Sequence, residues 1–554
     1  MIFKKFKKHK ALGLFLAVTL LVSSVPVGSF TVLAGDSTAA ETNVWDGRTA
    51  SKFASGKGSK TDPYIIETGA QLAYLAKQVN SGTSYSGKYI KLANNINLDN
   101  RAWTPIGSYA SSNKKYFEGS FDGNKMTVSG LNIKNAVAYS ALFGLARNAS
   151  ITDLTIAKSE VTGNGSCVAA VCAYAVCTVF SGCETADTVT VDGAESYLGG
   201  ICAYAVSRCE FSACTNKASL TVSDDASVYA GGICGYMYNS GSITYCVNSA
   251  EIVNNGKTDE KSGTGGICGA LYSGASFSYE IKNCKNLGEI KGNINTGGIV
   301  GCGNDKLEGC LNTAAVSGIG RVGGIVGYAI GDTDDTADTI FKCSNTANVT
   351  ATEDSTINEQ YIGGISGYQS DYTTEHCYNA AEVKASTDNS YVGGISGYIS
   401  CGSISSCHNY GALINASWYA GGIAVCGDDS TVTNCYYLEG TQPTEAQSLH
   451  IGGSEMSLQN FANGKVCTAL QGKTAEQIWG QSLSGADADL YPVFYNGQNA
   501  VVLKTEVVLG GITRQDGEYN GEEHTGYTGS ISGGAYTGDY TVTYTGRDGT
   551  VYQT

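Results

Sequence analysis

Short apolar segments alternate with polar turns along most of this 554-residue chain. Segments such as YIGGISGY (361–368) and GSISSC (402–407) are rich in β-branched residues and are bounded by Gly, Asn, Asp and Ser, which is typical of strands joined by tight turns. The repeated part of the chain has no apolar stripe at the i, i+3, i+4, i+7 spacing of a helix. The pattern therefore predicts an all-β protein and excludes repeat proteins with helical backs.

The tripeptide Gly-Gly-Ile recurs through the middle of the chain and divides it into units of 26 to 40 residues. Two degenerate copies, at 140–142 and 169–171, precede the eight intact ones, so that ten units are visible. The intact copies begin at Gly199, Gly231, Gly265, Gly297, Gly323, Gly363, Gly393 and Gly421.

Units of this length favour a parallel β-helix over a β-propeller, whose blades need about 40 residues and four strands each. We expect about ten coils, one for each unit, with the variation in length confined to outward loops such as 332–338. Successive coils stack roughly 4.8 Å apart, so a residue type that recurs at one coil position meets its own kind above and below.

A second marker, a cysteine, stands 12 to 19 residues after the second glycine of each intact Gly-Gly-Ile. Seven of these cysteines are followed by x-Asn. Asn at a turn bonds neighbouring backbone groups, so the two positions together predict a structural ladder along the coils. The cysteines are Cys214, Cys246, Cys284, Cys310, Cys343, Cys377, Cys407 and Cys435. The asparagines are Asn216, Asn248, Asn286, Asn312, Asn345, Asn379 and Asn409.

Other cysteines stand directly after Gly-Gly-Ile, and two interpretations of the thiols remain open. One is a disulfide within a coil, pairing Cys202 with Cys214 and Cys234 with Cys246. The other is a column of buried free thiols, since free Cys is among the most buried residue types. Spacing does not decide between them. The sequence has no Cys-x-x-Cys, which argues against zinc.

The N-terminus has the three parts of a secretory signal peptide. Lysines between 4 and 10 precede the apolar run 11–22, and small residues end at Ala34, where we expect cleavage. The run is shorter than the roughly 20 apolar residues that span a bilayer. The sequence therefore predicts an exported protein, for which disulfides are permitted and membrane contact is made only through the signal peptide.

The regions that flank the repeats differ from them in pattern. We expect an N-terminal cap and the first strands over 35–145, including a helix that starts with the capping box Thr68-x-x-Gln71. The repeats then occupy 146–440, and a mixed segment at 441–508 is expected to close the last coil. The remaining residues, 509–554, show an alternating strand pattern too short for a complete Ig-like fold.

Several of these motifs carry a resemblance to a known family. The units GGICGY (231–236) and GGISGY (393–398) resemble the GLUG-motif repeats of bacterial surface proteins, and the opening DPYIIETGAQLAYLAKQVN is similar to the N-terminal opening of those β-helix proteins. The stretch YNGEEHTGYTGSISGGAYTGDYTVTYTG resembles Ig-like stalk modules of the MBG type. The family includes adhesins and non-catalytic regions of IgA-cleaving zinc peptidases. The resemblance implies display on a Gram-positive surface, with cell-wall attachment through sequence beyond this partial module.

Composition narrows the function further. The chain has 50 acidic and 35 basic residues and a net charge of −15, which excludes a nucleic-acid binder because phosphate contacts need clustered Lys and Arg. Apolar residues make up 42% of the chain, enough for a long buried core. The 73 glycines are explained largely by the recurring coil position.

The sequence offers little catalytic chemistry. The mature chain's histidines, His376, His408, His450 and His524, lack the His-Glu-x-x-His spacing of zinc peptidases, and we interpret the first two as exposed coil residues. A polysaccharide lyase or hydrolase needs paired carboxylates, or Ca²⁺-binding acids with a base. Between 165 and 440 the only arginines are Arg208 and Arg321.

Three acidic pairs occur in the repeats. On a strand, adjacent residues face opposite ways, so the two carboxylates of a pair would not point at one catalytic site. We therefore interpret the pairs as solvated turns. No cofactor is expected, although a weak Ca²⁺ site in the 332–338 loop is possible. The pairs are Asp224-Asp225, Asp334-Asp335 and Asp428-Asp429.

These observations favour a non-catalytic adhesin that binds a host or dietary glycan or surface protein. A column of tyrosines at the Gly-Tyr ends offers rings that stack on sugars, or else only pack coil against coil. A polysaccharide-active enzyme, and a spacer or accessory region of a larger surface protease or adhesin, are the alternatives. The oligomeric state is left open. The tyrosines are Tyr204, Tyr236, Tyr328, Tyr368 and Tyr398.

Overall fold

The computed structural model describes residues 44–496 with short gaps, and four strand segments beyond them, all within the compact unit Asn43–Thr554. The gaps are 111–112, 135–137, 164, 193–195, 223–225, 273–278, 305, 332–337, 355–356, 388, 416–418, 444–450, 473–475 and 484–487. The segments are 508–514, 527–532, 543–545 and 551–553. The predicted signal peptide, the first two acidic pairs, most of the 332–338 loop, His450 and His524 lie outside the described residues.

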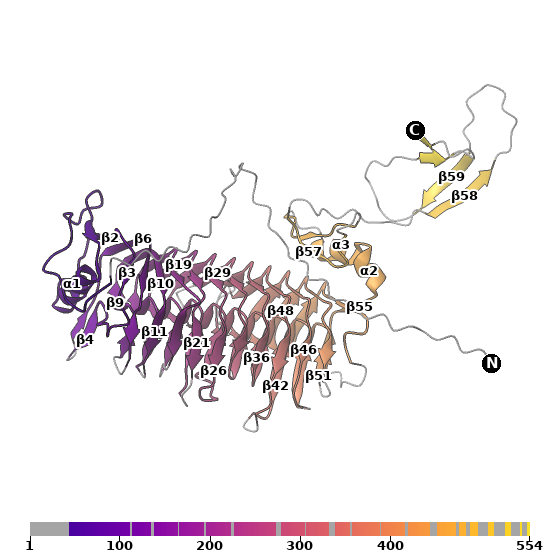
Figure 1. Ribbon diagram of the computed structural model, residues 1–554. Coiled ribbons are helices and arrows are strands. Elements are labelled where there is room, and N and C mark those ends of the chain that lie inside the picture. Colours follow the sequence, from indigo (N-terminus) through magenta and orange to yellow (C-terminus); the bar gives the residue numbers. More distant parts are fainter. Residues whose placement is uncertain are drawn as a thin grey trace, which may run out of the picture. The chain divides into compact units, whose positions relative to one another are not determined.

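The chain folds into a parallel β-solenoid of about 11 turns, as Figure 1 shows. A typical coil contains five short strands: β17 (Tyr197–Gly199), β18 (Cys202–Val206), β19 (Cys209–Ser212), β20 (Thr215–Asn216) and β21 (Ser219–Val222). Each strand pairs in parallel with its counterpart in the next coil. The prediction of an all-β parallel β-helix is confirmed.

Two of the five strand positions form ten-stranded parallel sheets. The first contains β17 together with β8 (Tyr139–Ser140), β12 (Cys167–Ala169), β22 (Tyr229–Gly231), β27 (Gly263–Gly265), β32 (Asn295–Gly297), β37 (Arg321–Gly323), β42 (Gln360–Gly363), β47 (Ser390–Gly393) and β51 (Tyr419–Gly421). The second contains β21 together with β7 (Asn132–Ile133), β11 (Ser159–Thr162), β16 (Val189–Asp192), β26 (Ile252–Asn254), β31 (Ile290–Lys291), β36 (Val316–Gly318), β41 (Val349–Ala351), β46 (Val383–Lys384) and β50 (Leu413–Ile414).

The other three positions merge into one 33-stranded sheet. The β18 position is also occupied, in other coils, by β9 (Phe143–Arg147), β13 (Cys172–Val176), β23 (Cys234–Tyr238), β28 (Cys268–Tyr272), β33 (Val300–Gly303), β38 (Val326–Ile330), β43 (Ser366–Ser370), β48 (Ser396–Ser405) and β52 (Ala424–Thr433). The β19 position is also occupied, in other coils, by β10 (Ser150–Ala157), β14 (Val179–Ser181), β24 (Gly241–Thr244), β29 (Tyr279–Lys282), β34 (Lys306–Glu308), β39 (Thr339–Phe341) and β44 (Tyr372–Glu375). The β20 position is also occupied, in other coils, by β15 (Glu184–Thr185), β25 (Val247–Asn248), β30 (Lys285–Asn286), β35 (Leu311–Asn312), β40 (Ser344–Asn345), β45 (Tyr378–Asn379), β49 (His408–Asn409) and β53 (Tyr436–Leu438).

Each residue of Gly-Gly-Ile has a separate task in the coil. The isoleucine points inward and is fully buried, as at Ile201 and Ile233. A Cβ on the first glycine, Gly199, would lie 1.9 Å from the Cys202 carbonyl oxygen, because the chain folds back tightly there. A Cβ on the second, Gly200, would lie 2.2 Å from the Asn216 side chain. The second glycine therefore makes room for the asparagine of the other marker.

The residue before each cysteine of the second marker turns the corner of the coil. It adopts a positive φ whatever its type, for example 54° at Tyr245, 52° at Lys342 and 51° at His376. This left-handed conformation favours Gly and Asn, and Gly309 and Asn283 occupy it in other coils. The sequence pattern did not reveal this position because its side chains differ from coil to coil.

The N-terminal residues form a helix and the first turns of the stack. Helix α1 (Gly69–Asn80) begins with the predicted capping box between Thr68 and Gln71, and its buried face includes Leu72 and Val79. Strands β1 (Tyr64–Ile66), β2 (Tyr89–Leu92), β3 (Ile96–Asn97) and β6 (Ser120–Ser129) pair in parallel ahead of the first repeat. The hairpin of β4 (Ser108–Ala110) and β5 (Asn113–Lys115) is antiparallel. The role of this region as a cap stays a prediction.

The segment after the last coil contacts both the edge of that coil and the outer side of the stack, and its role in closing the end stays a prediction. Strand β54 (Ile451–Gly452) pairs antiparallel with β52, and β55 (Ser454–Met456) pairs parallel with β53. The chain then continues as α2 (Leu458–Ala462), α3 (Lys465–Gln471), β56 (Trp479–Gly480) and β57 (Val493–Phe494). These elements pack on outward side chains of the last four coils, including Phe341, Tyr378 and Tyr436. We call residues 457–494 the side segment.

Asp428 and Asp429 differ from the expectation, since they lie within β52 and not in a turn, although both are exposed. In the C-terminal part, β58 (Val508–Arg514) pairs antiparallel with β59 (Tyr527–Ser532), and β60 (Thr543–Thr545) with β61 (Val551–Gln553). The stalk module stays a prediction. No described helix combines the length and apolar character needed to cross a membrane.

Candidate functional site

The five predicted tyrosines lie in one row on the outside of the stack. They occupy the third residue of the β18-type strands, and parallel pairing places Tyr174, Tyr204 and Tyr236 in register, and likewise Tyr328, Tyr368 and Tyr398. We call these six residues the first tyrosine row. Neighbours on both sides of each tyrosine in the strand are buried, whereas the tyrosine itself is partly exposed.

A second tyrosine row, which the sequence analysis missed, runs beside the first. It is formed by residues two positions before Gly-Gly in the β17-type strands, and its pattern, Tyr-x-Gly-Gly-Ile, is visible in the sequence once the strand is known to face outward. The row contains Tyr197, Tyr229, Tyr361, Tyr391 and Tyr419. Tyr139 stands at the same position of a degenerate unit, with Cys167 in register between it and Tyr197. The two rows together are called the tyrosine ridge.

The rings of the two rows contact one another within and between coils. Tyr197 stacks on Tyr204 with ring centres 4.6 Å apart, and Tyr361 stacks on Tyr391 at 5.0 Å. Tyr391 also meets Tyr398 edge to face at 5.2 Å. Such contacts stabilise the stack by roughly 0.5–1.5 kcal/mol per pair beyond the burial of area.

Burial and nearby tyrosines raise the pKa values of several phenol groups of the ridge. Burial raises the pKa of Tyr174 to about 12, and it raises the pKa values of Tyr197 and Tyr391. The hydroxyls are therefore neutral at physiological pH, and each can donate and accept hydrogen bonds.

The ridge is interrupted in its middle. Where the first row would continue past Tyr236, in-register positions carry Ala270 and Cys302, and where the second row would continue past Tyr229 they carry Gly263, Asn295 and Arg321. The Arg321 guanidinium lies 4.2 Å from the ring centre of Tyr328. It also donates to Asn295 Oδ1 at 3.1 Å and to Glu260 at 3.2 Å. A pocket of about 380 Å³ opens beside Arg321 and Tyr361.

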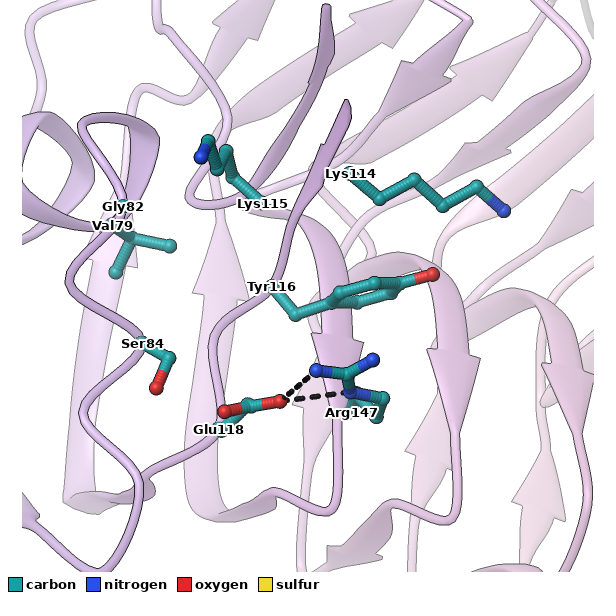
Figure 2. A pocket seen from close by; sticks show the side chains of 8 residues that line it. All are labelled: Val79, Gly82, Ser84, Lys114, Lys115, Tyr116, Glu118 and Arg147. Carbon is teal, nitrogen blue, oxygen red and sulfur yellow. Dashed lines mark hydrogen bonds and ion pairs between the residues drawn. The ribbon is translucent and has the colours of Figure 1, made fainter. Parts of the chain in front are cut away.

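A second cation stands at the N-terminal end of the ridge, at the edge of the pocket in Figure 2. Lys114 Nζ lies 4.6 Å from the Tyr174 ring centre. In the same pocket, of about 170 Å³, Arg147 packs on the ring of Tyr116 at 4.5 Å and donates to Glu118 through Nε at 2.8 Å. Cations over aromatic faces are attracted by the ring quadrupole, so the ridge presents both aromatic faces and localised positive charge.

Inside the coils the seven predicted asparagines form one continuous ladder. Each Nδ2 donates to the Oδ1 of the next asparagine at 2.8 or 2.9 Å, from Asn216 to Asn409. Each also donates to the backbone carbonyl two residues on, as Asn286 does to Gly288 at 2.9 Å. The Thr185 hydroxyl donates to Asn216 at the start of the ladder, and Tyr437 occupies the next position after Asn409.

All 20 cysteines are free thiols in the structure. The disulfides considered within a coil, Cys202 with Cys214 and Cys234 with Cys246, are not formed. Cys202 instead lies in register with Cys234 of the next coil, and the Cys214 amide donates to the Cys246 sulfur at 3.4 Å. The stacking of coils therefore brings each of these thiols beside its counterpart one coil away.

His376 and His408 were interpreted as exposed residues, and this was wrong. Their side chains lie under the side segment, with residue exposures of 8% and 0%. Trp479 Nε1 donates to His376 Nδ1 at 3.1 Å, and the Trp479 ring centre lies 5.1 Å from that of His408. Burial lowers the pKa of His376 and lowers that of His408 to about 3. Both rings are thus neutral where they pack.

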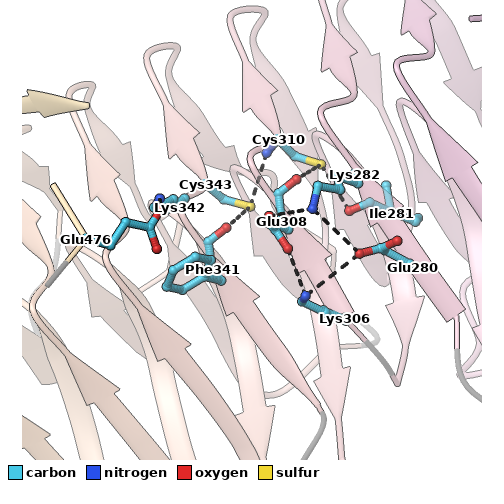
Figure 3. Close-up of polar contacts among 10 residues, drawn as sticks. All are labelled: Glu280, Ile281, Lys282, Lys306, Glu308, Cys310, Phe341, Lys342, Cys343 and Glu476. Atoms are coloured by element: carbon cyan, nitrogen blue, oxygen red, sulfur yellow. Dashed lines mark hydrogen bonds and ion pairs between the residues drawn. The ribbon is translucent and has the colours of Figure 1, made fainter. Parts of the chain in front are cut away.

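Two acidic side chains of the outer sheet surface, Glu280 and Glu308, are paired with lysines. Figure 3 shows Glu280 and Glu308 on neighbouring coils, each near Lys282 and Lys306. Lys282 and Lys306 approach Glu308 to 2.7 and 2.8 Å. Partial burial would raise the pKa of Glu308, but these lysines outweigh it and lower that pKa. A general acid needs the opposite shift. Within the described residues no group of three or more His, Cys, Asp or Glu is arranged to hold a metal ion.

Comparisons with known proteins give distant similarities. No family model matches the chain. The chain is 30% identical to the "Putative Gly-rich membrane protein" of Evansella cellulosilytica over 120 residues. This match covers 21% of this chain and only 13% of that relative. A solved structure from Bacteroides ovatus, named as a putative immunoglobulin A1 protease, covers 80% of this chain and 95% of its own at 16% identity and a TM-score of 0.28.

Proposed function

We propose that this chain is an exported, non-catalytic binding protein that holds a host or dietary glycan, or a glycan-bearing surface protein, on the tyrosine ridge. The observation that carries the proposal is the pair of partly exposed tyrosine rows on successive coils. Tyrosine offers a large rigid contact area at low entropic cost and a hydroxyl for hydrogen bonds. Secretion, with or without cell-wall attachment, follows from the predicted signal peptide and from the resemblance to surface proteins.

The ridge has more than the packing alternative requires. If the tyrosines served only to pack coil against coil, their rings could be fully buried. The tyrosines of both rows instead keep part of their surface exposed. Lys114 and Arg321 are themselves held over ring faces. Glu260 balances the charge of Arg321, so it is Lys114 that adds a charge favouring acidic sugars or acidic protein groups. The coil stack beneath supplies a rigid base.

The experiment applies the exported chain to a glycan array and to immobilised mucin and plant cell-wall polysaccharides. The variant Tyr361→Ser/Tyr391→Ser/Tyr398→Ser removes three partly exposed rings from two successive coils. We expect its binding to be at least about tenfold weaker, because a central aromatic contact is worth more than about 1.4 kcal/mol. The matched control is Tyr245→Ala, since Tyr245 is 63% exposed outside the ridge and its counterpart in the preceding coil is Ala213.

Two results would count against the proposal. Equal binding by the triple variant and the control would place the site elsewhere, and no binding to any probe would favour a spacer role. Product release from a polysaccharide would instead favour the enzymatic alternative, to which the β-helix fold is equally suited. In that case Glu280→Gln and Glu308→Gln test the pair of carboxylates on neighbouring coils.

A further inference from the structure

Thirteen of the 20 cysteines stand in two columns inside the coils. The first thiol column is formed by the first residues of β13, β18, β23 and β28, which are in register. The second runs along the corner that precedes the asparagine ladder. The first column contains Cys172, Cys202, Cys234 and Cys268. The second contains Cys183, Cys214, Cys246, Cys284, Cys310, Cys343, Cys377, Cys407 and Cys435.

In the second column the backbone of one cysteine contacts the sulfur of the next. The amide of one cysteine donates to the sulfur of the next at 3.4 Å from Cys310 to Cys343, as Figure 3 shows, and at 3.2 Å from Cys377 to Cys407. Parallel strands lie about 4.8 Å apart. This spacing falls within the Cα separation of about 4.4–6.8 Å that a disulfide accepts. A disulfide also needs its two Cβ atoms about 3.5–4.5 Å apart, so bond formation draws the two coils slightly closer at that point.

We propose that sulfur atoms one coil apart within each thiol column are sites of disulfides that link successive coils. The co-reactant is a small-molecule disulfide such as oxidised glutathione. A cysteine thiolate attacks it, the mixed disulfide is attacked by the neighbouring thiolate, and one S–S bond forms in the protein as the S–S bond of the co-reactant breaks. The two cysteines lose two protons and two electrons, and two small thiols carry them away.

The geometry limits when and how many bonds form. All column thiols are buried, so a small-molecule disulfide does not reach them in the folded stack, which is therefore slow to react. Oxidation therefore takes place while coils are still forming or when they open locally. Each sulfur forms one bond, so the four thiols of the first column allow two disulfides. The nine of the second allow four and leave one thiol free.

The test maps the bonds in the full chain after refolding in a glutathione redox buffer. The protein is denatured in alkylating reagent without reductant, digested with trypsin and analysed by mass spectrometry. Cys284 is alone in the tryptic peptide 283–285, and Cys310 is alone in 307–321. We expect 283–285 to be linked to 307–321 or to 218–257, which contains Cys246. Cys302, alone in 292–306 and outside both columns, should remain alkylated.

Variants make the pairing rule specific. Cys310→Ser divides the second column into two groups of four, so we expect the link between 283–285 and 307–321 to vanish and the remaining free thiol of that column to disappear. Cys302→Ser, the matched control, should change neither. If Cys310→Ser fails to fold, Cys435→Ser removes the terminal member instead and should also abolish the free thiol.

Other outcomes overturn the proposal. Complete alkylation of the wild-type columns after oxidative refolding would show permanently free thiols. A link from 159–208 to 209–217 that is kept in Cys209→Ser and in Cys183→Ser but lost in Cys202→Ser would show the pairing of Cys202 with Cys214. Oxidised protein should also unfold several degrees above reduced protein, because each link shortens the loops free in the unfolded chain. An unchanged melting temperature in a protein with mapped links would contradict their role as staples between coils.

Discussion

The asparagine ladder and the tyrosine ridge both repeat one residue type on successive coils, yet they have different physical characters. Every described ladder asparagine from Asn216 to Asn409 is fully buried and bonded to its neighbours. The ridge tyrosines keep part of their surface exposed, and their hydroxyls can donate and accept hydrogen bonds. Repetition by itself therefore does not identify a binding site. What distinguishes the two is whether the repeated group is satisfied within the column.

Gly232→Ala is expected to break the ladder most strongly. Its Cβ would lie 2.3 Å from the Gly266 carbonyl oxygen and 2.6 Å from Asn248 Oδ1. Backbone and ladder must both shift, at a cost of roughly 3 kcal/mol of unfolding free energy. Urea unfolding measures the loss. Gly440→Ala is the control, since its Cβ would meet nothing within 4 Å and only the positive φ of 77° costs energy. An equal loss in both variants would refute the packing explanation.

Asn286→Ala should have the next largest effect. The substitution removes the acceptor of the Asn248 amide and the donor to Asn312, both in a fully buried setting. Leaving these groups without one partner costs about 2 kcal/mol. Urea unfolding compares this variant with Asn255→Ala, which alters an exposed asparagine. A loss below that of the control would mean that the ladder relaxes at no cost.

The side segment sharpens the comparison, because it covers a third set of aromatic residues. His408 of β49 is neutral under the docked segment, with its pKa lowered from 6.5 to about 3, so it binds a proton once the segment is released. Docking is therefore at full strength above pH 6.5 and weakens as the pH falls towards about 3. Trp479 fluorescence, measured against pH, should report release.

His408→Phe is the matched variant for that titration. Neither ring nitrogen of His408 has a hydrogen-bond partner among the described residues, so a phenyl ring fits without losing a bond. The variant should shift the transition to lower pH. His376, which faces Lys342, Glu375 and Glu476, would account for what remains. An unchanged titration in His408→Phe would exclude His408 as the titrating group.

The ridge should respond least in stability and most in binding. Tyr391→Ser removes two stacked contacts, at about 5.0 Å each, from a partly exposed ring, and we expect a loss near 1 kcal/mol. Thermal unfolding measures the stability, and the mucin assay measures the binding. A stability loss as large as that of Asn286→Ala, with unchanged binding, would make the ridge a packing element like the ladder.

Much of the coil was predictable from the sequence, because stacking places equal residues together and so leaves a period in the chain. The sequence identified the coil through Gly-Gly-Ile and Cys-x-Asn. In the structure these two motifs are in contact, because the absence of a side chain at Gly200 leaves room for Asn216. The second tyrosine row was equally regular and was missed only because its outward direction was unknown. The left-handed turn residues, such as Tyr245 and Lys342, were hidden because backbone geometry, not side-chain type, is what recurs there.

The sequence by itself determined the period, the β class and the residues that fill the repeated interior, because these depend on local pattern and on neighbours one coil away. Tertiary structure alone decided which histidines are buried. Trp479 reaches His376 across 103 residues, and Lys342 meets Glu476 across 134. Such contacts leave no period in the chain, since each is made once, between a coil surface and a segment that does not repeat.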